Sequence, residues 1–149
     1  MKYGFIGCGN MGGAIAKALA KSTTDIFITD RSGKAKETAV ALGCQYTDIF
    51  TIANECDRIF LAVKPQLMAD VLAPVQQVLL LRKPMLITMA AGLKIERIQA
   101  LAGGNLPVVR IMPNTPVSVG KGMIPYCCNS RTCGARCPSL SRLFRSWLT

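Results

Sequence analysis

Histidine is absent from the 149-residue sequence. Without an imidazole, the chain lacks the commonest general acid–base catalyst and cannot carry serine–histidine or cysteine–histidine nucleophile chemistry. Aromatic residues make up only 6% of the chain, too few for the stacking platforms that hold single-stranded nucleic acids. No uninterrupted apolar run approaches the roughly 18 residues of a membrane-spanning helix, so we expect no membrane partner.

Acidic residues are also scarce. Eight acids against 18 bases give a formal net charge of +10, which by itself favours a nucleic-acid partner. The bases are scattered, however, with no block of five or six, and the stretch 126–149 contributes arginines without a single acid. We therefore expect no nucleic-acid partner.

The beginning of the sequence does not resemble a secretion signal. The apolar run at 3–7 is too short for the core of a signal peptide and continues directly into a glycine motif. Half of the residues are hydrophobic, enough for the core of one domain of ordinary size. These features predict a cytoplasmic protein, in which Cys8, Cys44 and Cys56 stay reduced and buried.

Short apolar segments alternate with segments of helical periodicity through residue 112. Runs rich in β-branched and aromatic residues predict strands at 3–6, 25–29, 45–47, 58–63, 85–89 and 108–112. Apolar residues at helical spacing predict helices at 11–21, 33–42, 49–55, 65–79 and 94–101. This alternation is typical of a parallel sheet with helices on both faces. The predicted fold class is α/β, a Rossmann-type, doubly wound and mostly parallel sheet.

The character of the sequence changes near Pro125. We assign residues 1–125 to a dinucleotide-binding domain and residues 126–149 to an irregular tail rich in Arg, Ser and Cys. The tail has no acid, no lysine and no sustained periodicity. Such a composition is typical of a frame-shifted or disordered segment, too short to form a core of its own.

Four cysteines lie in the tail, at Cys127, Cys128, Cys133 and Cys137. A tetrahedral zinc site needs four such ligands, so a metal site is one interpretation. However, no C-x-x-C pair occurs among them. We therefore predict no metal site.

A G-x-G-x-x-G motif lies between the first predicted strand and the first predicted helix. It comprises Gly7, Cys8, Gly9, Asn10, Met11 and Gly12. In this context Gly7 permits a tight turn, Gly9 lets the backbone approach a pyrophosphate, and Gly12 lets the helix pack closely on the strand. The helix N-terminus then offers unpaired N–H groups and a partial positive charge to the phosphates. The motif predicts NAD(P)(H) binding, and the alternative is a glycine-rich turn that binds nothing.

Three residues after the second predicted strand bear on the choice of cofactor. Asp30 stands near the position where an acid bonds the ribose 2′-OH of NAD. Arg31 and Ser32 instead suit the 2′-phosphate of NADP, because the planar guanidinium donates two parallel hydrogen bonds. Asp30 could also be a helix cap or a solvated turn residue. We favour NADP(H) over NAD(H).

Four segments, taken in order, are more specific than the glycine motif alone. They are Gly4–Ile15, Leu61–Gln66, Ala90–Gly92 and Arg110–Pro116, the last reading Arg-Ile-Met-Pro-Asn-Thr-Pro. Together they resemble the N-terminal half of pyrroline-5-carboxylate reductase over about residues 1–125. The Met-Pro-Asn-Thr-Pro segment carries most of this specificity, although by itself it also suits a rigid turn.

The resemblance implies hydride transfer from NAD(P)H to the C=N carbon of 1-pyrroline-5-carboxylate, giving L-proline. This reaction fits a chain without histidine, because an iminium already carries the proton that its nitrogen needs. The loops that follow the predicted strands would complete the cofactor site, since ligands bind at the carboxyl ends of parallel strands. Their candidate residues are Ala62, Val63, Lys64, Pro65, Ala90, Ala91, Gly92 and Asn114. We assign no catalytic residue.

The family resemblance also implies a helical C-terminal domain that binds the small-molecule substrate and forms a homo-oligomer. This sequence has no counterpart of that domain, so we expect a cofactor-binding half with little or no reductase activity of its own. Two alternatives stay open. One is another Rossmann reductase of the 3-hydroxyacid dehydrogenase type, and the other is a non-enzymatic nucleotide-binding module.

Overall fold

Seven strands form one sheet in the order β3-β2-β1-β4-β5-β6-β7. Their bounds are β1 (Tyr3–Ile6), β2 (Ile26–Thr29), β3 (Gln45–Tyr46), β4 (Arg58–Leu61), β5 (Met85–Thr88), β6 (Val108–Ile111) and β7 (Tyr126–Cys128). The first six strands run parallel, and β7 pairs antiparallel with β6. The computed structural model describes residues 1–114, 116–117, 124–130, 142 and 144–145. The strand order confirms the predicted doubly wound sheet.

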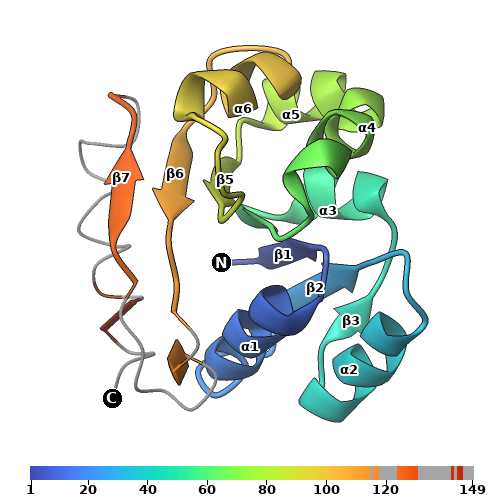
Figure 1. Cartoon of the computed structure of the whole chain (residues 1–149). Helices are drawn as coiled ribbons and strands as arrows, with labels where there is room; N and C mark the ends of the chain where they lie inside the picture. The colour runs from blue at the N-terminus through green and yellow to red at the C-terminus, as the bar shows by residue number, and fades with distance from the viewer. Residues whose placement is uncertain (115, 118–123, 131–141, 143, 146–149) are drawn as a thin grey trace.

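The helices form a layer on each side of the sheet. Their bounds are α1 (Asn10–Leu19), α2 (Lys34–Leu42), α3 (Ile49–Glu55), α4 (Met68–Leu72), α5 (Gln76–Arg82) and α6 (Ile95–Leu101), with short 3₁₀ turns η1 (Pro65–Leu67) and η2 (Ala73–Val75). Helices α1 and α2 lie on one side, and α3 to α6 lie on the other (Figure 1). None of the helices in the described part of the chain is long and apolar enough to span a membrane.

Two hydrophobic clusters fill the spaces between the sheet and its helix layers. One joins α1 and α2 to the sheet around Phe5 and Phe60, whose rings stack with centroids 4.5 Å apart. The other joins α3 to α6 to the opposite face, around Ile59 and Leu86. Because side chains alternate across a strand and both faces are covered, the central strands are buried at every position.

The helix predicted at 65–79 is not continuous. The structure divides it into η1, α4 and η2, and α5 then runs to Arg82. The interruption falls at Pro74, which has no N–H to donate and whose ring collides with the preceding turn of an α-helix. The prediction of one helix was therefore wrong, because it used Pro65 as the start of the helix and took no account of the second proline, Pro74.

The stretch expected to be irregular from residue 126 begins with a strand. Tyr126, Cys127 and Cys128 pair with Ile111, Arg110 and Val109 in an antiparallel ladder. Asn129 extends this pairing with its side chain: its Nδ2 donates to the Leu106 carbonyl at 2.8 Å, and its Oδ1 accepts from the Val108 N–H at 3.3 Å.

Phe144 also belongs to the folded core. Its ring is 4% exposed and lies 5.6 Å from the ring of Tyr126, centroid to centroid. Cys127 and Cys128 are free thiols, while Cys133 and Cys137 lie outside the described residues. Strand β7 and Phe144 thus belong to the folded sheet and its core, and the irregular character of the rest of the tail remains a prediction.

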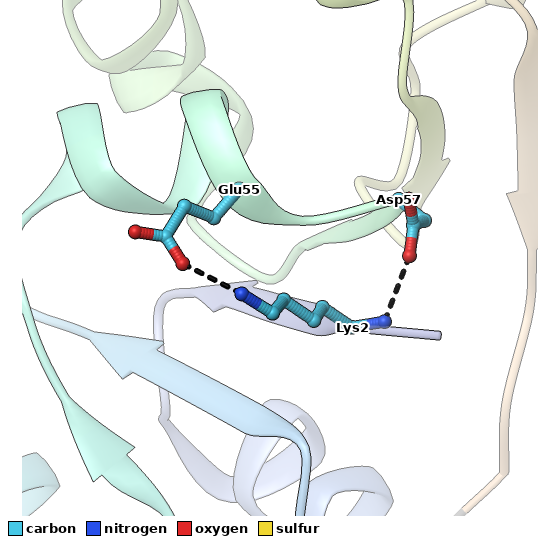
Figure 2. Close-up of polar contacts among 3 residues, drawn as sticks. All are labelled: Lys2, Glu55 and Asp57. Carbon is cyan, nitrogen blue, oxygen red and sulfur yellow. Dashed lines mark hydrogen bonds and ion pairs between the residues drawn. The ribbon is translucent and has the colours of Figure 1, made fainter.

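A small polar cluster stands at the amino end of β1 (Figure 2). The backbone N–H of Lys2 donates to Asp57 Oδ2 at 2.8 Å, and its Nζ donates to Glu55 Oε2 at 2.8 Å. Both side chains of the ion pair are about half exposed, so the pair contributes little to stability. Cys56, which lies between these two acids in the sequence, is buried.

Candidate nucleotide-binding site

The carboxyl ends of β1, β2 and β4 meet at one edge of the sheet. The chain leaves β1 toward β2 on one side and returns to β4 on the other, so this edge is the topological switch point. A pocket of about 540 Å³ opens there. Its position is the one at which open α/β sheets bind their ligands.

Seven of the residues predicted for the cofactor line this pocket. They are Gly7, Gly9, Asp30, Arg31, Ala62, Val63 and Lys64. They come from the loops after β1, β2 and β4, as the sequence predicted from the parallel order of the strands. The structure therefore brings together three loops that are far apart along the chain.

Gly7 and Gly12 pack directly against the end of β4. Gly7 has a φ of +94°, and a Cβ there would lie 2.5 Å from the Ala62 carbonyl oxygen. A Cβ on Gly12 would lie 2.7 Å from the Ala62 Cβ. Both positions are therefore restricted to glycine by the fold, because any side chain would push α1 off the sheet.

Gly9 is different, because nothing in the described chain requires glycine there. Its φ of −71° and ψ of −160° are extended values that other residues adopt. A Cβ at this position would meet no atom within 4 Å. The open space beside Gly9 faces the pocket, so a bound molecule can approach the bare backbone.

Helix α1 begins within the glycine loop, at Asn10. Gly9 is the N-cap of this helix, and no side chain makes a capping hydrogen bond. The N–H of Gly13 is the first to find a partner in the helix, the Gly9 carbonyl oxygen at 2.8 Å. An uncapped helix start with a partial positive charge suits an anion such as a phosphate.

Asp30 connects the β2 loop to the glycine loop. Its Oδ2 accepts from the Cys8 N–H at 2.5 Å, and its Oδ1 accepts from the Ser32 N–H at 3.1 Å. The Tyr46 hydroxyl donates to the Asp30 carbonyl oxygen at 3.1 Å. Arg31 is exposed at the mouth of the pocket, where its guanidinium can reach a ligand.

The remaining predicted residues do not line this pocket. Cys8, Asn10, Met11, Gly12, Ser32 and Pro65 adjoin it in the chain, while Ala90, Ala91, Gly92 and Asn114 follow β5 and β6 at the same edge of the sheet. Ala90 is buried, and its N–H donates to Thr88 Oγ1 at 3.2 Å. Asn114 is exposed, and its carbonyl oxygen accepts from the Val117 N–H at 3.1 Å.

Sequence reasoning missed the wall of the pocket that faces the glycine loop. This wall consists of Asp48, Ile49, Leu67, Asp70, Val71 and Pro74. Leu67, Val71 and Pro74 are spaced i, i+4 and i+7, a pattern that indicates one face of a helical segment. Asp48 follows β3, a parallel strand that ends at this edge. Both signals were present in the sequence.

Asp48 serves the fold as a helix cap. Its Oδ1 accepts from the Thr51 N–H and its Oδ2 from the Thr51 hydroxyl, each at 2.9 Å. These hydrogen bonds hold the pKa of the Asp48 carboxyl below its usual range. Asp70, on the same wall, is exposed.

The cysteines near the site are not activated as nucleophiles. Burial, followed by the charge of Asp30, raises the pKa of the Cys8 thiol, and burial raises the pKa of Cys44. A raised pKa leaves less thiolate at neutral pH, and the thiolate is the reactive form. Among the described residues no group of three or more Cys, Asp and Glu side chains is placed to hold a metal ion.

The arrangement can therefore hold a ligand with a phosphate and an apolar part. It provides bare backbone at Gly9, amide groups at the start of α1, cations at Arg31 and Lys64, and an apolar wall. Its described lining holds neither histidine nor cysteine, and its carboxylates are those of Asp30, Asp48 and Asp70.

Comparisons with known proteins agree with this geometry. Residues 2–92 match the sequence model of the family described as NADP oxidoreductase coenzyme F420-dependent. Pyrroline-5-carboxylate reductase of Aquifex aeolicus is 31% identical over 127 residues, 83% of this chain and 46% of that protein. The enzyme of Haemophilus influenzae is 38% identical over 128 residues, 80% of this chain and 45% of that protein.

A solved structure extends the likeness to the fold. Plasmodium falciparum pyrroline carboxylate reductase with NADP bound superimposes with a TM-score of 0.86 at 30% identity, over 99% of this chain and 55% of that one. This chain thus spans about half the length of the relatives that it matches. It belongs to the family described as NADP oxidoreductase coenzyme F420-dependent, and its resemblance to the N-terminal, nucleotide-binding half of pyrroline-5-carboxylate reductases is confirmed.

Proposed function

We propose that residues 1–125 form a domain that binds NADP(H) across the switch point of the sheet. The observation that carries this proposal is Gly9. Its backbone conformation and its surroundings would accept a side chain, so the fold alone gives no reason for glycine there. A pyrophosphate that lies against the Gly9 backbone and the start of α1 supplies the reason.

The choice of NADP(H) over NAD(H) rests on the loop after β2. Arg31 is exposed on the pocket wall and can clamp a 2′-phosphate with its planar fork of donors. Ser32 follows it, with a hydroxyl that can donate to the same phosphate. NADP in the structure of the Plasmodium falciparum relative supports this choice.

The nicotinamide end would lie farther along the same edge of the sheet. The loops after β5 and β6 hold Ala90, Ala91, Gly92 and Asn114 there. Small residues leave room for a flat ring, and the Asn114 amide can both donate to and accept from a carboxamide. When bound, the nicotinamide supplies the hydride that this chain cannot provide.

The whole protein would then reduce the C=N bond of 1-pyrroline-5-carboxylate to give L-proline. This reaction comes to the chain from its relatives, which are pyrroline-5-carboxylate reductases. The role of the described residues is to bind and orient the cofactor, and substrate contacts would come from the half of the relatives that this chain does not match. Residues 1–149 alone would bind nucleotide without turning over the substrate.

The cellular location and the oligomeric state follow from the same proposal. Free cysteines at 8, 44 and 56 suit a reducing compartment, so we place the protein in the cytoplasm. The relatives' remaining half would also provide the contacts of a homo-oligomer.

A calorimetric titration with NADPH tests the proposal most directly. Gly9→Val places a branched side chain in the space for the pyrophosphate, so we expect its affinity to fall by at least about tenfold, or roughly 1.4 kcal/mol. The same variant should unfold within about 1 kcal/mol of the parent, because a Cβ at this position meets nothing within 4 Å and the main cost is that of a poorer N-cap residue.

Gly13→Ala is the matched control, on the next turn of α1. Its Cβ would lie 3.6 Å from the Cys8 carbonyl oxygen and 3.7 Å from Cys8 Sγ, ordinary contact distances. It should bind NADPH within about twofold of the parent and gain some helix stability. Failure of the parent to bind either NADPH or NADH would overturn the proposed function.

A further inference from the structure

The carboxylate of Asp30 is already engaged by the main chain on both of its oxygens. Oδ2 accepts from the N–H of Cys8 in the glycine loop, at 2.5 Å, and Oδ1 accepts from the N–H of Ser32, at 3.1 Å. The two amides belong to different loops, the one after β1 and the one after β2. A single side chain therefore ties the two loops together.

This orientation differs from that of an acid that binds a ribose. Such an acid presents its oxygens outward to the sugar hydroxyls, whereas the Asp30 carboxylate turns toward the backbone of its own protein. The backbone of Asp30 is held as well, because the Tyr46 hydroxyl donates to the Asp30 carbonyl oxygen at 3.1 Å. Tyr46 thereby joins β3 to the same corner.

We propose that Asp30 is a positioning residue, which holds the glycine loop in its binding conformation and does not select between NADP(H) and NAD(H). Selection at the 2′ position is then left to Arg31 and Ser32, which follow it on the pocket edge. The inference rests on the proposed function for its ligand. The two hydrogen bonds of Asp30 can be tested without any ligand.

The binding test compares the two nucleotides in each variant by calorimetry. Asp30→Ala removes hydrogen bonds to a charged group, so both affinities should fall by a similar factor, about tenfold each, with the NADPH-to-NADH ratio kept within about twofold. Arg31→Ala should lower NADPH affinity by at least about tenfold and leave NADH within about twofold. A loss of NADH binding in Asp30→Ala about tenfold larger than the loss of NADPH binding would overturn the inference, since the acid would then be a ribose ligand.

The second test observes the hydrogen bonds themselves in ¹⁵N-labelled protein without nucleotide. In the parent, hydrogen exchange at the Cys8 and Ser32 amides should be slow, because both donate to the Asp30 carboxylate. Asp30→Ala should abolish this protection at both amides. Asp30→Asn, which keeps one carbonyl oxygen as an acceptor, should restore part of the protection at one of the two amides.

The Thr51 amide provides an internal control in the same spectra. It donates to Asp48 at 2.9 Å and should be unchanged in every Asp30 variant, whereas general loss of structure would affect it too. A Cys8 amide whose hydrogen exchange is unchanged in Asp30→Ala would overturn the inference. If the parent binds neither nucleotide but the Cys8 amide behaves as expected, the proposed function fails, and the role of Asp30 in holding the two loops together stands.

Discussion

At the scale of single residues, Cys56 makes folding sensitive to alkali. The thiol is 3% exposed, and burial, followed by the nearby charges of Asp57 and Glu55, raises its pKa from the ordinary 9.0 to about 12. The folded state thus holds the thiol proton more tightly than the unfolded state does. The stabilisation is fully present below pH 9 and is lost as the pH rises from about 9 toward 12.

Urea unfolding at several pH values checks this expectation. The parent should lose stability between pH 8 and pH 10.5, and Cys56→Ala should lose less over that range, since it has no thiol to ionise. The variant will be less stable throughout, because it leaves a cavity beside Gly4 and Ile52. Parallel curves for the two proteins would show that Cys56 is not the responsible group.

At this scale the sequence was most informative at positions where close packing permits a single residue type. Gly7 and Gly12 could be assigned their roles from the motif, because a strand, a turn and a helix in close contact exclude any side chain. The direction of a polar side chain is not set by such exclusion. The sequence placed Asp30 at the right edge but gave no sign that its carboxylate turns inward to Cys8, since this depends on how two distant loops approach.

At the scale of elements, two helices end at a residue in the left-handed conformation, which strains one of these residues and not the other. Gly43 ends α2 at a φ of +68°, where glycine carries no strain. Lys83 ends α5 at a φ of +51° and is the one non-glycine residue with positive φ in the described part of the chain. A lysine in this region is strained by its Cβ.

Exchanging the residue types should therefore have opposite effects. Lys83→Gly should stabilise the protein by about 0.5–1 kcal/mol, and Gly43→Ala should destabilise it by about 1 kcal/mol. Neither position is crowded by a contact that would mask the effect, since a Cβ on Gly43 meets nothing within 4 Å and Lys83 is exposed. Thermal unfolding measures both, and changes of the same sign would contradict this account of the two helix ends.

Elements were predictable where they are buried on both sides or begin at a clear cap. Strands β4 and β5 have apolar centres at 59–61 and 85–87, and helix α3 begins at a capping Asp48, so local chemistry indicates where these elements lie. Strand β7 has no such signal. Its three residues are mostly exposed, and they are a strand only because β6 offers an edge on which to pair, a long-range contact that no local pattern reveals.

At the scale of the whole molecule, the sheet should open from its edges. Strands β1 and β4 lie in the middle with both faces covered, while β3 has two exposed residues and β7 has one neighbour. Amide hydrogen exchange should therefore be slowest in β1 and β4, by about two orders of magnitude or more relative to β3 and β7. Equal protection in β7 and β1 would show that another part of the protein covers that edge.

The overall topology was predictable for a physical reason. Parallel strands need crossover connections, and right-handed crossovers from a glycine motif leave few arrangements of six strands. The second wall of the pocket was missed although the helical spacing of Leu67, Val71 and Pro74 is visible in the sequence. These three residues come from η1, α4 and η2, into which the segment is divided, so a single continuous helix is the wrong template for this wall.

The contrast among the three loop glycines also has a consequence for descent. Gly7 and Gly12 are fixed by the Ala62 end of β4, so any lineage that keeps this fold inherits them whether or not the protein still has a ligand. Gly9 faces open space and is released from selection as soon as nucleotide binding ceases to matter. Among descendants of such a gene, a larger residue at position 9 beside intact glycines at 7 and 12 would therefore mark a lineage that has kept its architecture and lost its cofactor.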